Sequence, residues 1–135
     1  MELKELVGEH VLDAVDFSSE KVEIWGYQYE DCQVVRFRLD GKVFTVAEDP
    51  EDGYRSSMKY IIVTEEPISN VFAPISVIGR HSAEGEYGQQ DDVLELVDVL
   101  TGLVVLEVGT MDTDDYYPRF VASFHPEAMV TNRLS

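Results

Sequence analysis

An Asp-Gly pair at residues 40–41 separates two segments in which apolar and polar side chains alternate, QVVRFRL before it and KVFTVA after it. Asp-Gly tolerates the two positive φ angles of a type I′ turn, whose twist matches that of flanking antiparallel strands. A two-residue loop places Phe37 opposite Phe44 and Val35 opposite Val46, with two arginines on the other face. The sequence therefore predicts a β-hairpin with one apolar face and one hydrated face.

Residues 92–109 contain a second pair of apolar segments, separated by Thr101-Gly102. A helix competes with a hairpin here, because Asp92 and Glu95 form a capping-box pattern and Gly102 is suited to end a helix. The valines in the first segment and the Val-Val-Leu-Glu-Val run in the second favour strands. We therefore predict a second hairpin.

The expected register of this second hairpin follows from a two-residue turn at Thr101-Gly102. It places Val97 opposite Leu106 and Val99 opposite Val104, while Asp98 falls on the other face. Both faces are largely apolar, which indicates a central position in a sheet that is covered on each side.

The rest of the chain is also rich in strand signals. Residues 2–8 predict one short helix that ends at Gly8. The five prolines are expected to mark breaks, because proline cannot donate to a strand ladder. Further strands are expected at residues 10–17, 22–27, 58–64, 76–79 and 120–124. The predicted fold is a single domain over residues 1–135, mainly β with α+β as the alternative, its antiparallel sheet forming a sandwich or a strongly curled sheet with one or two short helices.

The chain is strongly acidic, with a net charge of −17, yet 44% of its residues are apolar, as in a folded protein. Residues 81–118 contain ten carboxylates and neither lysine nor arginine. Such a charge repels nucleic acids and anionic membranes and attracts cationic protein surfaces. We expect a partner with a basic surface, no direct contact with nucleic acid and no membrane contact.

The location and redox chemistry follow from similar observations. No apolar run approaches the ~20 residues that span a bilayer, and the N-terminus is acidic where a signal peptide is basic. A cytoplasmic location is expected. The single cysteine, Cys32, has no partner for an internal disulfide and indicates no redox role.

Two acidic clusters that contain tyrosine follow predicted strands. Their carboxylates and tyrosines combine charge with flat contact area, which is typical of protein interfaces. The clusters form one negative patch if the two strand ends lie at the same edge of the sheet. The predicted partner-binding residues are Glu48, Asp49, Glu51, Asp52, Tyr54, Asp112, Asp114, Asp115, Tyr116 and Tyr117.

The same clusters offer an alternative as a divalent metal site. Oxygen ligands suit Mg²⁺ and Ca²⁺, and the candidates are Asp49, Asp52, Asp112, Asp114 and Asp115. Neither cluster has the glycine and glutamate spacing of a calcium-binding loop. We therefore predict no metal and no other cofactor, with a metal-dependent enzyme kept as the alternative.

Motifs for catalysis are scarce. The chain has three histidines, His10, His81 and His125, and none lies at metal-ligand spacing from another. No Gly-x-Ser-x-Gly elbow, phosphate-binding glycine loop or dinucleotide fingerprint occurs. A non-catalytic role is expected.

Residues 32–41 leading into 48–57, and residues 92–102 leading into 109–118, resemble stretches in small acidic proteins encoded by bacteriophages and prophages. The resemblance covers roughly residues 30–130 and brings no catalytic residues. It implies a binder that occupies a functional surface of a host protein in the bacterial cytoplasm, including the nucleic-acid-binding groove of a defence protein.

The expected function is therefore a non-catalytic protein-binding module, an inhibitor or modulator of a basic host protein whose negative charges imitate a nucleic acid. The alternatives are the metal-dependent enzyme and a structural or accessory phage protein that assembles through an exposed sheet edge.

Overall fold

The computed structural model describes residues 1–52, 55–82, 91–112 and 118–130. These residues form a 3₁₀ helix, eight strands and a short α-helix: η1 (Leu3–Leu6), β1 (Gly8–Ile24), β2 (Tyr27–Leu39), β3 (Lys42–Asp52), β4 (Arg55–Thr64), β5 (Val71–Ser82), β6 (Asp92–Asp98), β7 (Val104–Asp112), β8 (Pro118–Phe124) and α1 (Glu127–Val130). The mainly β prediction is confirmed. No helix in this described part of the chain is long and apolar enough to cross a membrane.

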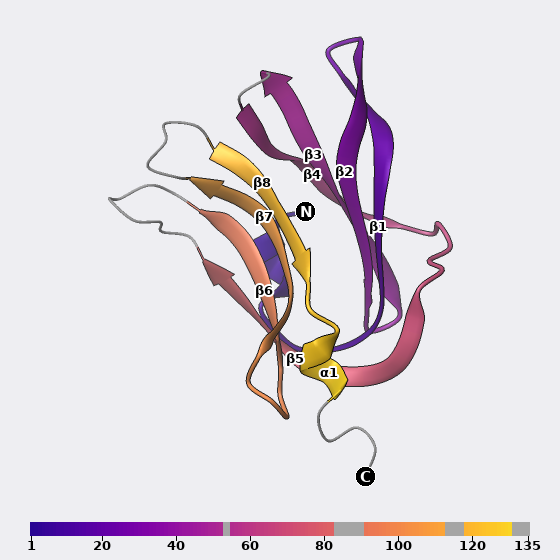
Figure 1. The fold of residues 1–135 in the computed structure, drawn as a ribbon, viewed down its shortest axis with the longest axis vertical. Helices are drawn as coiled ribbons and strands as arrows, with labels where there is room; N and C mark the ends of the chain where they lie inside the picture. The colour runs from indigo at the N-terminus through magenta and orange to yellow at the C-terminus, as the bar shows by residue number, and fades with distance from the viewer. Residues whose placement is uncertain (53–54, 83–90, 113–117, 131–135) are drawn as a thin grey trace.

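The strands form one sheet that closes into a barrel in the order β1-β2-β3-β4-β8-β7-β6-β5 (Figure 1). Seven of the neighbouring pairs are antiparallel. The remaining pair, β4 and β8, is parallel, with Ser56 opposite Arg119 as its one register pair. A hydrogen bond from the Met58 N–H to Thr110 Oγ1, 2.6 Å long, also links β4 to β7, the strand on the other side of β8.

Strand β1 bends so that this ring can close. Straight strands in a closed ring need an even number of antiparallel neighbours, because each such pair reverses the strand direction. With seven, one strand must change direction along its length. The ladders of β1 with β2 and with β5 both shift between Leu12 and Ala14, which places the bend there because a bulge kinks its strand. The start of β1 thus pairs with β5, and the rest continues along β2.

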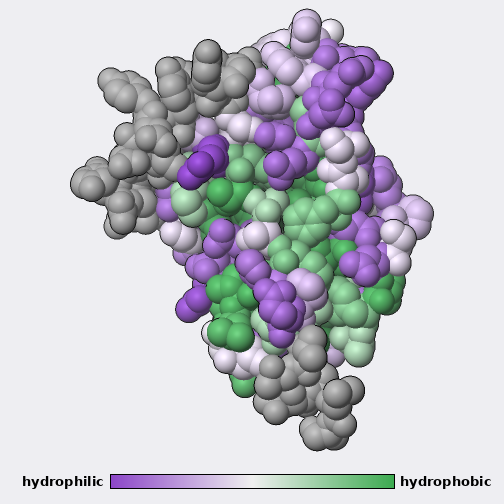
Figure 2. Space-filling view, viewed as in Figure 1, coloured by the Kyte–Doolittle hydropathy of each residue, from purple (hydrophilic) through white to green (hydrophobic). Residues whose placement is uncertain are grey.

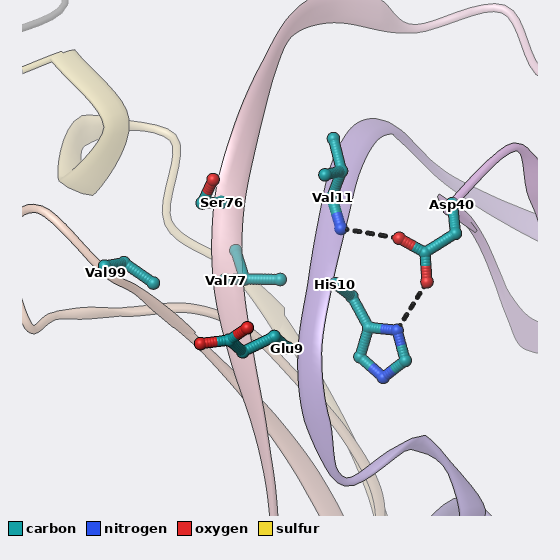
Figure 3. Close-up of a pocket in the computed structure, with 7 residues that line it drawn as sticks. All are labelled: Glu9, His10, Val11, Asp40, Ser76, Val77 and Val99. Carbon is teal, nitrogen blue, oxygen red and sulfur yellow. Dashed lines mark hydrogen bonds and ion pairs between the residues drawn. The ribbon is translucent and has the colours of Figure 1, made fainter.

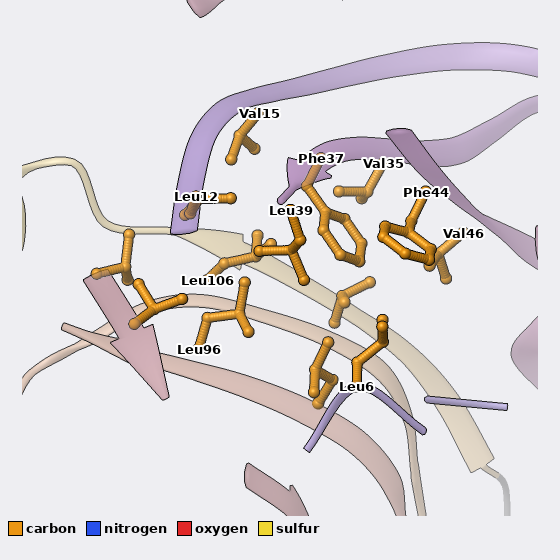
Figure 4. Close-up of a cluster of buried hydrophobic side chains, with 14 of the residues drawn as sticks. Leu6, Leu12, Val15, Val35, Phe37, Leu39, Phe44, Val46, Leu96 and Leu106 are labelled. Atoms are coloured by element: carbon orange, nitrogen blue, oxygen red, sulfur yellow. The ribbon is translucent and has the colours of Figure 1, made fainter. Parts of the chain in front are cut away.

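The interior of the barrel is filled with side chains (Figure 4). Phe37 and Phe44 lie opposite each other with stacked rings, 5.7 Å between centroids, and η1 contributes Leu3 and Leu6. Strand β5 makes room for η1 with Gly79, because a Cβ on this residue would lie 2.2 Å from the Leu6 carbonyl oxygen. Helix η1 therefore packs tightly against β5, with Leu3 and Leu6 in the core.

A second, smaller hydrophobic cluster lies on the opposite face of β2 and β3. Val34 pairs with Ala47, and each points away from the main core because its neighbour, Val35 or Val46, points into it. The cluster is formed by Val22, Ile24, Cys32, Val34 and Ala47, packed against Tyr29 and Tyr60. The distal half of the β1–β2 hairpin is thus a packed structure.

The first hairpin has the predicted turn and register. Asp40 and Gly41 have φ angles of +53° and +82°, and Phe37 pairs with Phe44 and Val35 with Val46. The sequence therefore predicted the turn and the residue pairs correctly, but the expected hydrated face was wrong, because Val34, Thr45 and Ala47 are buried on it.

The second hairpin is present, and strands were the right choice over a helix, but the predicted register was wrong. A bulge after Leu96 places Val97 opposite Val104 and Leu96 opposite Leu106. The connection spans residues 99–103, longer than the predicted two-residue turn, and Asp98 is buried. The Asp98 carboxylate accepts the Leu100 N–H at 2.8 Å, so a local side-chain hydrogen bond shaped the turn.

Other expected boundaries were also wrong. Residues 10–17 and 22–27 are not two strands, because β1 runs continuously to Ile24 and the chain turns at residues 25–26. Pro50 and Pro74 lie inside β3 and β5 instead of ending them. Both lie at register shifts of the ladder, where no amide donor is needed.

Replacing Gly79 by alanine should destabilise the fold, because the added methyl group meets the backbone of η1. We expect a loss of about 2 kcal/mol in the free energy of unfolding, measured by urea denaturation. Ser76→Ala, at an exposed position of the same strand, is the control and should change little. An unaltered denaturation midpoint for Gly79→Ala would show that η1 does not pack as described.

Candidate functional site

The ends of β3 and β7 lie at the same end of the barrel (Figure 1). β3 ends at Asp52 and β7 at Asp112, and the strands that follow them, β4 and β8, start side by side through the pair Ser56–Arg119. Asp92 begins β6 at this end, opposite Thr110. The two acidic clusters, far apart in the sequence, are therefore carried by neighbouring strand ends. We call this end, which carries Asp52, Asp92 and Asp112, the acidic rim.

Two predicted contact residues, Glu48 and Asp49, lie just below the rim and are half-buried. Glu48 accepts a hydrogen bond from the Gln33 N–H at 2.9 Å and another from the Ser56 hydroxyl. Asp49 pairs with Ser57 in the β3–β4 ladder. Glu48 therefore ties β2, β3 and β4 together beneath the rim.

The structure describes the backbone of only some of the other predicted contact residues. Glu51 and Asp52 end β3, and Asp112 ends β7. Tyr54, Asp114, Asp115, Tyr116 and Tyr117 lie outside the described residues. Among the residues that are described, no group of three or more histidine, cysteine, aspartate or glutamate side chains is arranged to hold a metal ion.

Several basic side chains form ion pairs on the outer wall of the barrel. Arg36 contacts Glu20 at 2.5 Å and Glu66 at 3.0 Å. Arg38 forms a fork with Asp13, with N···O distances of 2.6 and 2.9 Å. Because these arginines are neutralised within the chain, the field that reaches a partner is dominated by the remaining carboxylates.

A histidine-aspartate pair that the sequence did not reveal lies near the start of β1, beside a cavity of about 330 Å³ (Figure 3). His10 Nδ1 is 2.7 Å from Asp40 Oδ2, and Nε2 is 2.8 Å from the Leu6 carbonyl oxygen. Asp40 also accepts the Val11 N–H at 2.9 Å. His10 and Asp40 together therefore join η1, β1 and the β2–β3 turn.

We call His10 and Asp40 the clamp, because their hydrogen bonds hold separate parts of the chain together. Both ring nitrogens of His10 lie within hydrogen-bond distance of an oxygen atom of the chain, Asp40 Oδ2 or the Leu6 carbonyl oxygen. A general base needs a ring nitrogen free to take a proton from a substrate. In the sequence, only the Asp-Gly turn marks this site. The pairing of Asp40 with His10 leaves no local pattern, because His10 lies 30 positions earlier in the chain.

Two carboxylates face each other on the outer wall, Glu95 on β6 and Glu107 on β7. Burial, followed by the charge of Glu95, raises the pKa of Glu107, whereas His125 acts in the opposite direction. Arg80 lies 3.9 Å from Glu95 and relieves part of the repulsion. Like charges directly opposite each other weaken a strand pair, so this position reduces stability.

No family model matches the chain, and no curated protein or solved structure matches it. Function is therefore inferred from the charges and geometry of the described residues. The acidic rim is the feature to which both the sequence and the strand topology point.

Asp40→Asn should destabilise the protein by about 1–2 kcal/mol at neutral pH, because the charged hydrogen bond with His10 is lost. The hydrogen bond from His10, followed by that from Val11, lowers the pKa of Asp40. Asp40 therefore stabilises the fold above its ordinary pKa, and this contribution is lost as the pH falls through the lowered value.

Urea denaturation between pH 3 and 7 measures this effect as the difference between wild type and Asp40→Asn. The difference should shrink as the pH falls. Asp31→Asn is a matched control, because Asp31 is exposed and also has a positive φ of 57°. A difference that stays constant over this range would contradict the clamp.

Glu107→Gln should stabilise the fold by about 0.5 kcal/mol at pH 7. With a raised pKa in the folded state, Glu107 contributes stability at acid pH that is lost as the pH rises through the folded value, because the folded state holds the proton more tightly. The gain should therefore vanish at acid pH, as measured by thermal unfolding. Glu9→Gln, at an exposed position of β1, is the control; equal gains at both pH values would exclude the repulsion.

Proposed function

We propose that this protein is a non-catalytic binding module that uses its acidic rim to engage a partner protein with a basic surface. The observation that carries the proposal is the parallel pair Ser56–Arg119, because it sets the strand ends of two acidic clusters side by side. Carboxylates on adjacent strand ends act on a partner as one patch, since fields from neighbouring charges add.

The charge balance and the scaffold support this proposal. The net charge is −17, and Arg36 and Arg38 are already paired with acids of the chain. The filled interior holds the strands that carry the rim. A rigid carrier favours binding, because little conformational entropy is lost when the complex forms.

The resemblance to small acidic phage proteins extends the proposal to a biological role. The protein would be an inhibitor or modulator encoded by a phage, acting in the host cytoplasm on a host protein whose basic groove binds nucleic acid. Carboxylates spaced along strand ends would then occupy the groove in place of phosphates.

A triple substitution at both strand ends tests the rim. Glu51→Gln, Asp52→Asn and Asp112→Asn together remove three charges where β3 and β7 end. Proteins retained from a bacterial lysate at low salt by the wild type are identified, purified and titrated with each variant. We expect the triple variant to associate about tenfold more slowly at low salt, and this difference to shrink at high salt, where the charges are screened.

The matched control removes the same number of charges elsewhere. Glu9→Gln, Glu65→Gln and Glu127→Gln are exposed positions outside the rim and should leave association close to wild type. If the two triple variants bind equally well, binding reflects net charge and the rim has no special role. Binding that is independent of salt would contradict the electrostatic basis altogether.

A further inference from the structure

The β1–β2 hairpin ends in a two-residue turn made by Trp25 and Gly26. Their φ angles are +53° and +80°, almost the same as the +53° and +82° of Asp40 and Gly41. Such left-handed positions favour glycine, asparagine and aspartate, and a bulky side chain there is an outlier. Trp25 thus occupies a position that the other hairpin gives to aspartate.

Folding does not explain this tryptophan. The side chain of Asp40 forms hydrogen bonds with His10 and Val11, whereas Trp25 is 92% exposed to solvent. A large apolar side chain in water, held in an unfavourable backbone conformation, adds little to the stability of the fold. Strain of this kind is typical of functional positions.

The part of the β1–β2 hairpin next to Trp25 is held in place by packing and a hydrogen bond. Val22 and Ile24 are buried in the second hydrophobic cluster directly below the turn. Lys59 donates a hydrogen bond from its ammonium group to the Glu23 carbonyl oxygen and so ties the hairpin to β4. Trp25 is therefore presented in a defined place, which reduces the entropy lost on binding.

The surroundings of Trp25 are aromatic and acidic. Tyr27 is 66% exposed, and its ring lies 4.8 Å from that of Tyr29. Glu23 and Asp31 are exposed near the turn, and hydrophilic residues gather over this part of the hairpin (Figure 2). Two basic residues lie on this side: Lys21 is 3.4 Å from Glu30 and is paired within the chain, and the ammonium group of Lys59 is held at the Glu23 carbonyl oxygen, so the exposed carboxylates of Glu23 and Asp31 outnumber the one remaining positive charge.

We propose that Trp25 is an anchor that enters an apolar pocket on a partner protein, and that lysine and arginine side chains surround this pocket. Tryptophan and tyrosine are the residues most enriched at the energetic centres of interfaces. The carboxylates around the turn attract the basic border of the pocket, and a guanidinium can stack on the indole ring. The proposal rests on the proposed function and adds to it the contact residue and the partner's chemistry.

A random peptide library without tryptophan tests the partner's chemistry directly. We expect the wild-type chain to select peptides that combine lysine or arginine with large apolar residues. Trp25 is the only tryptophan, so its emission should shift to shorter wavelength when a selected peptide removes the indole from water. Selection of peptides without basic residues, or of none, would overturn the proposal.

Trp25→Asn removes the indole ring and keeps the turn, because asparagine tolerates a positive φ. Binding of fluorescein-labelled selected peptides, measured by anisotropy, should weaken at least tenfold, while the melting temperature stays the same or rises. Leu100→Ala is the matched control: it removes another exposed apolar side chain, 61% exposed, from the β6–β7 connection, and should bind as the wild type does. Binding of Trp25→Asn within twofold of the wild type would refute the anchor.

Two further arms distinguish other outcomes. Vesicles of phosphatidylcholine, with or without phosphatidylserine, should leave the Trp25 emission unchanged; a shift to shorter wavelength would assign Trp25 to a membrane interface and overturn the proposal.

The rim variant with Glu51→Gln, Asp52→Asn and Asp112→Asn is titrated in parallel against proteins retained from the lysate. If it loses binding while Trp25→Asn keeps it, the anchor fails and the rim stands. The reverse result leaves the anchor standing without the rim.

Discussion

The closure of the sheet depends on the bend in β1. With seven antiparallel pairs and one parallel pair in the ring, the strands cannot all remain straight. The shift between Leu12 and Ala14 occurs in both ladders of β1 and lets the start of this strand pair with β5 while the rest pairs with β2. The start of β1 also brings η1 over Gly79. The same stretch of β1 thus takes part in closing the sheet and in packing η1 against β5.

The parallel contact between β4 and β8 matters most for the proposed function. It rests on one register pair, and the hydrogen bond from Met58 to Thr110 also links β4 to β7. The β4–β8 contact sets the end of β3 beside the end of β7, and so makes one acidic rim from two separate stretches of sequence. The outer wall contributes less negative charge to a partner, because several of its acids are already paired with arginines.

The two type I′ turns use nearly the same backbone for different purposes. At one, the Asp40 carboxylate holds His10 and the Val11 amide, so the turn residue stabilises the fold. At the other, Trp25 is held out in solvent on an ordered hairpin. This contrast within one chain is the reason for proposing a binding role for Trp25, because aspartate or asparagine suits the backbone better.

The sequence by itself determined the strands with a clear local signal. Asp40-Gly41 and the alternation around it predicted the first hairpin, pair by pair, because turn chemistry and side-chain period depend on near neighbours. The register of residues 92–108 was missed, because a bulge and the buried Asp98 shift it. Sequence also identified the acidic clusters, but only the tertiary structure decided that their strand ends are neighbours. The pairing of β4 with β8, the clamp between His10 and Asp40 and the exposure of Trp25 depend on contacts between distant residues or on what covers a side chain, and neither is encoded in local pattern.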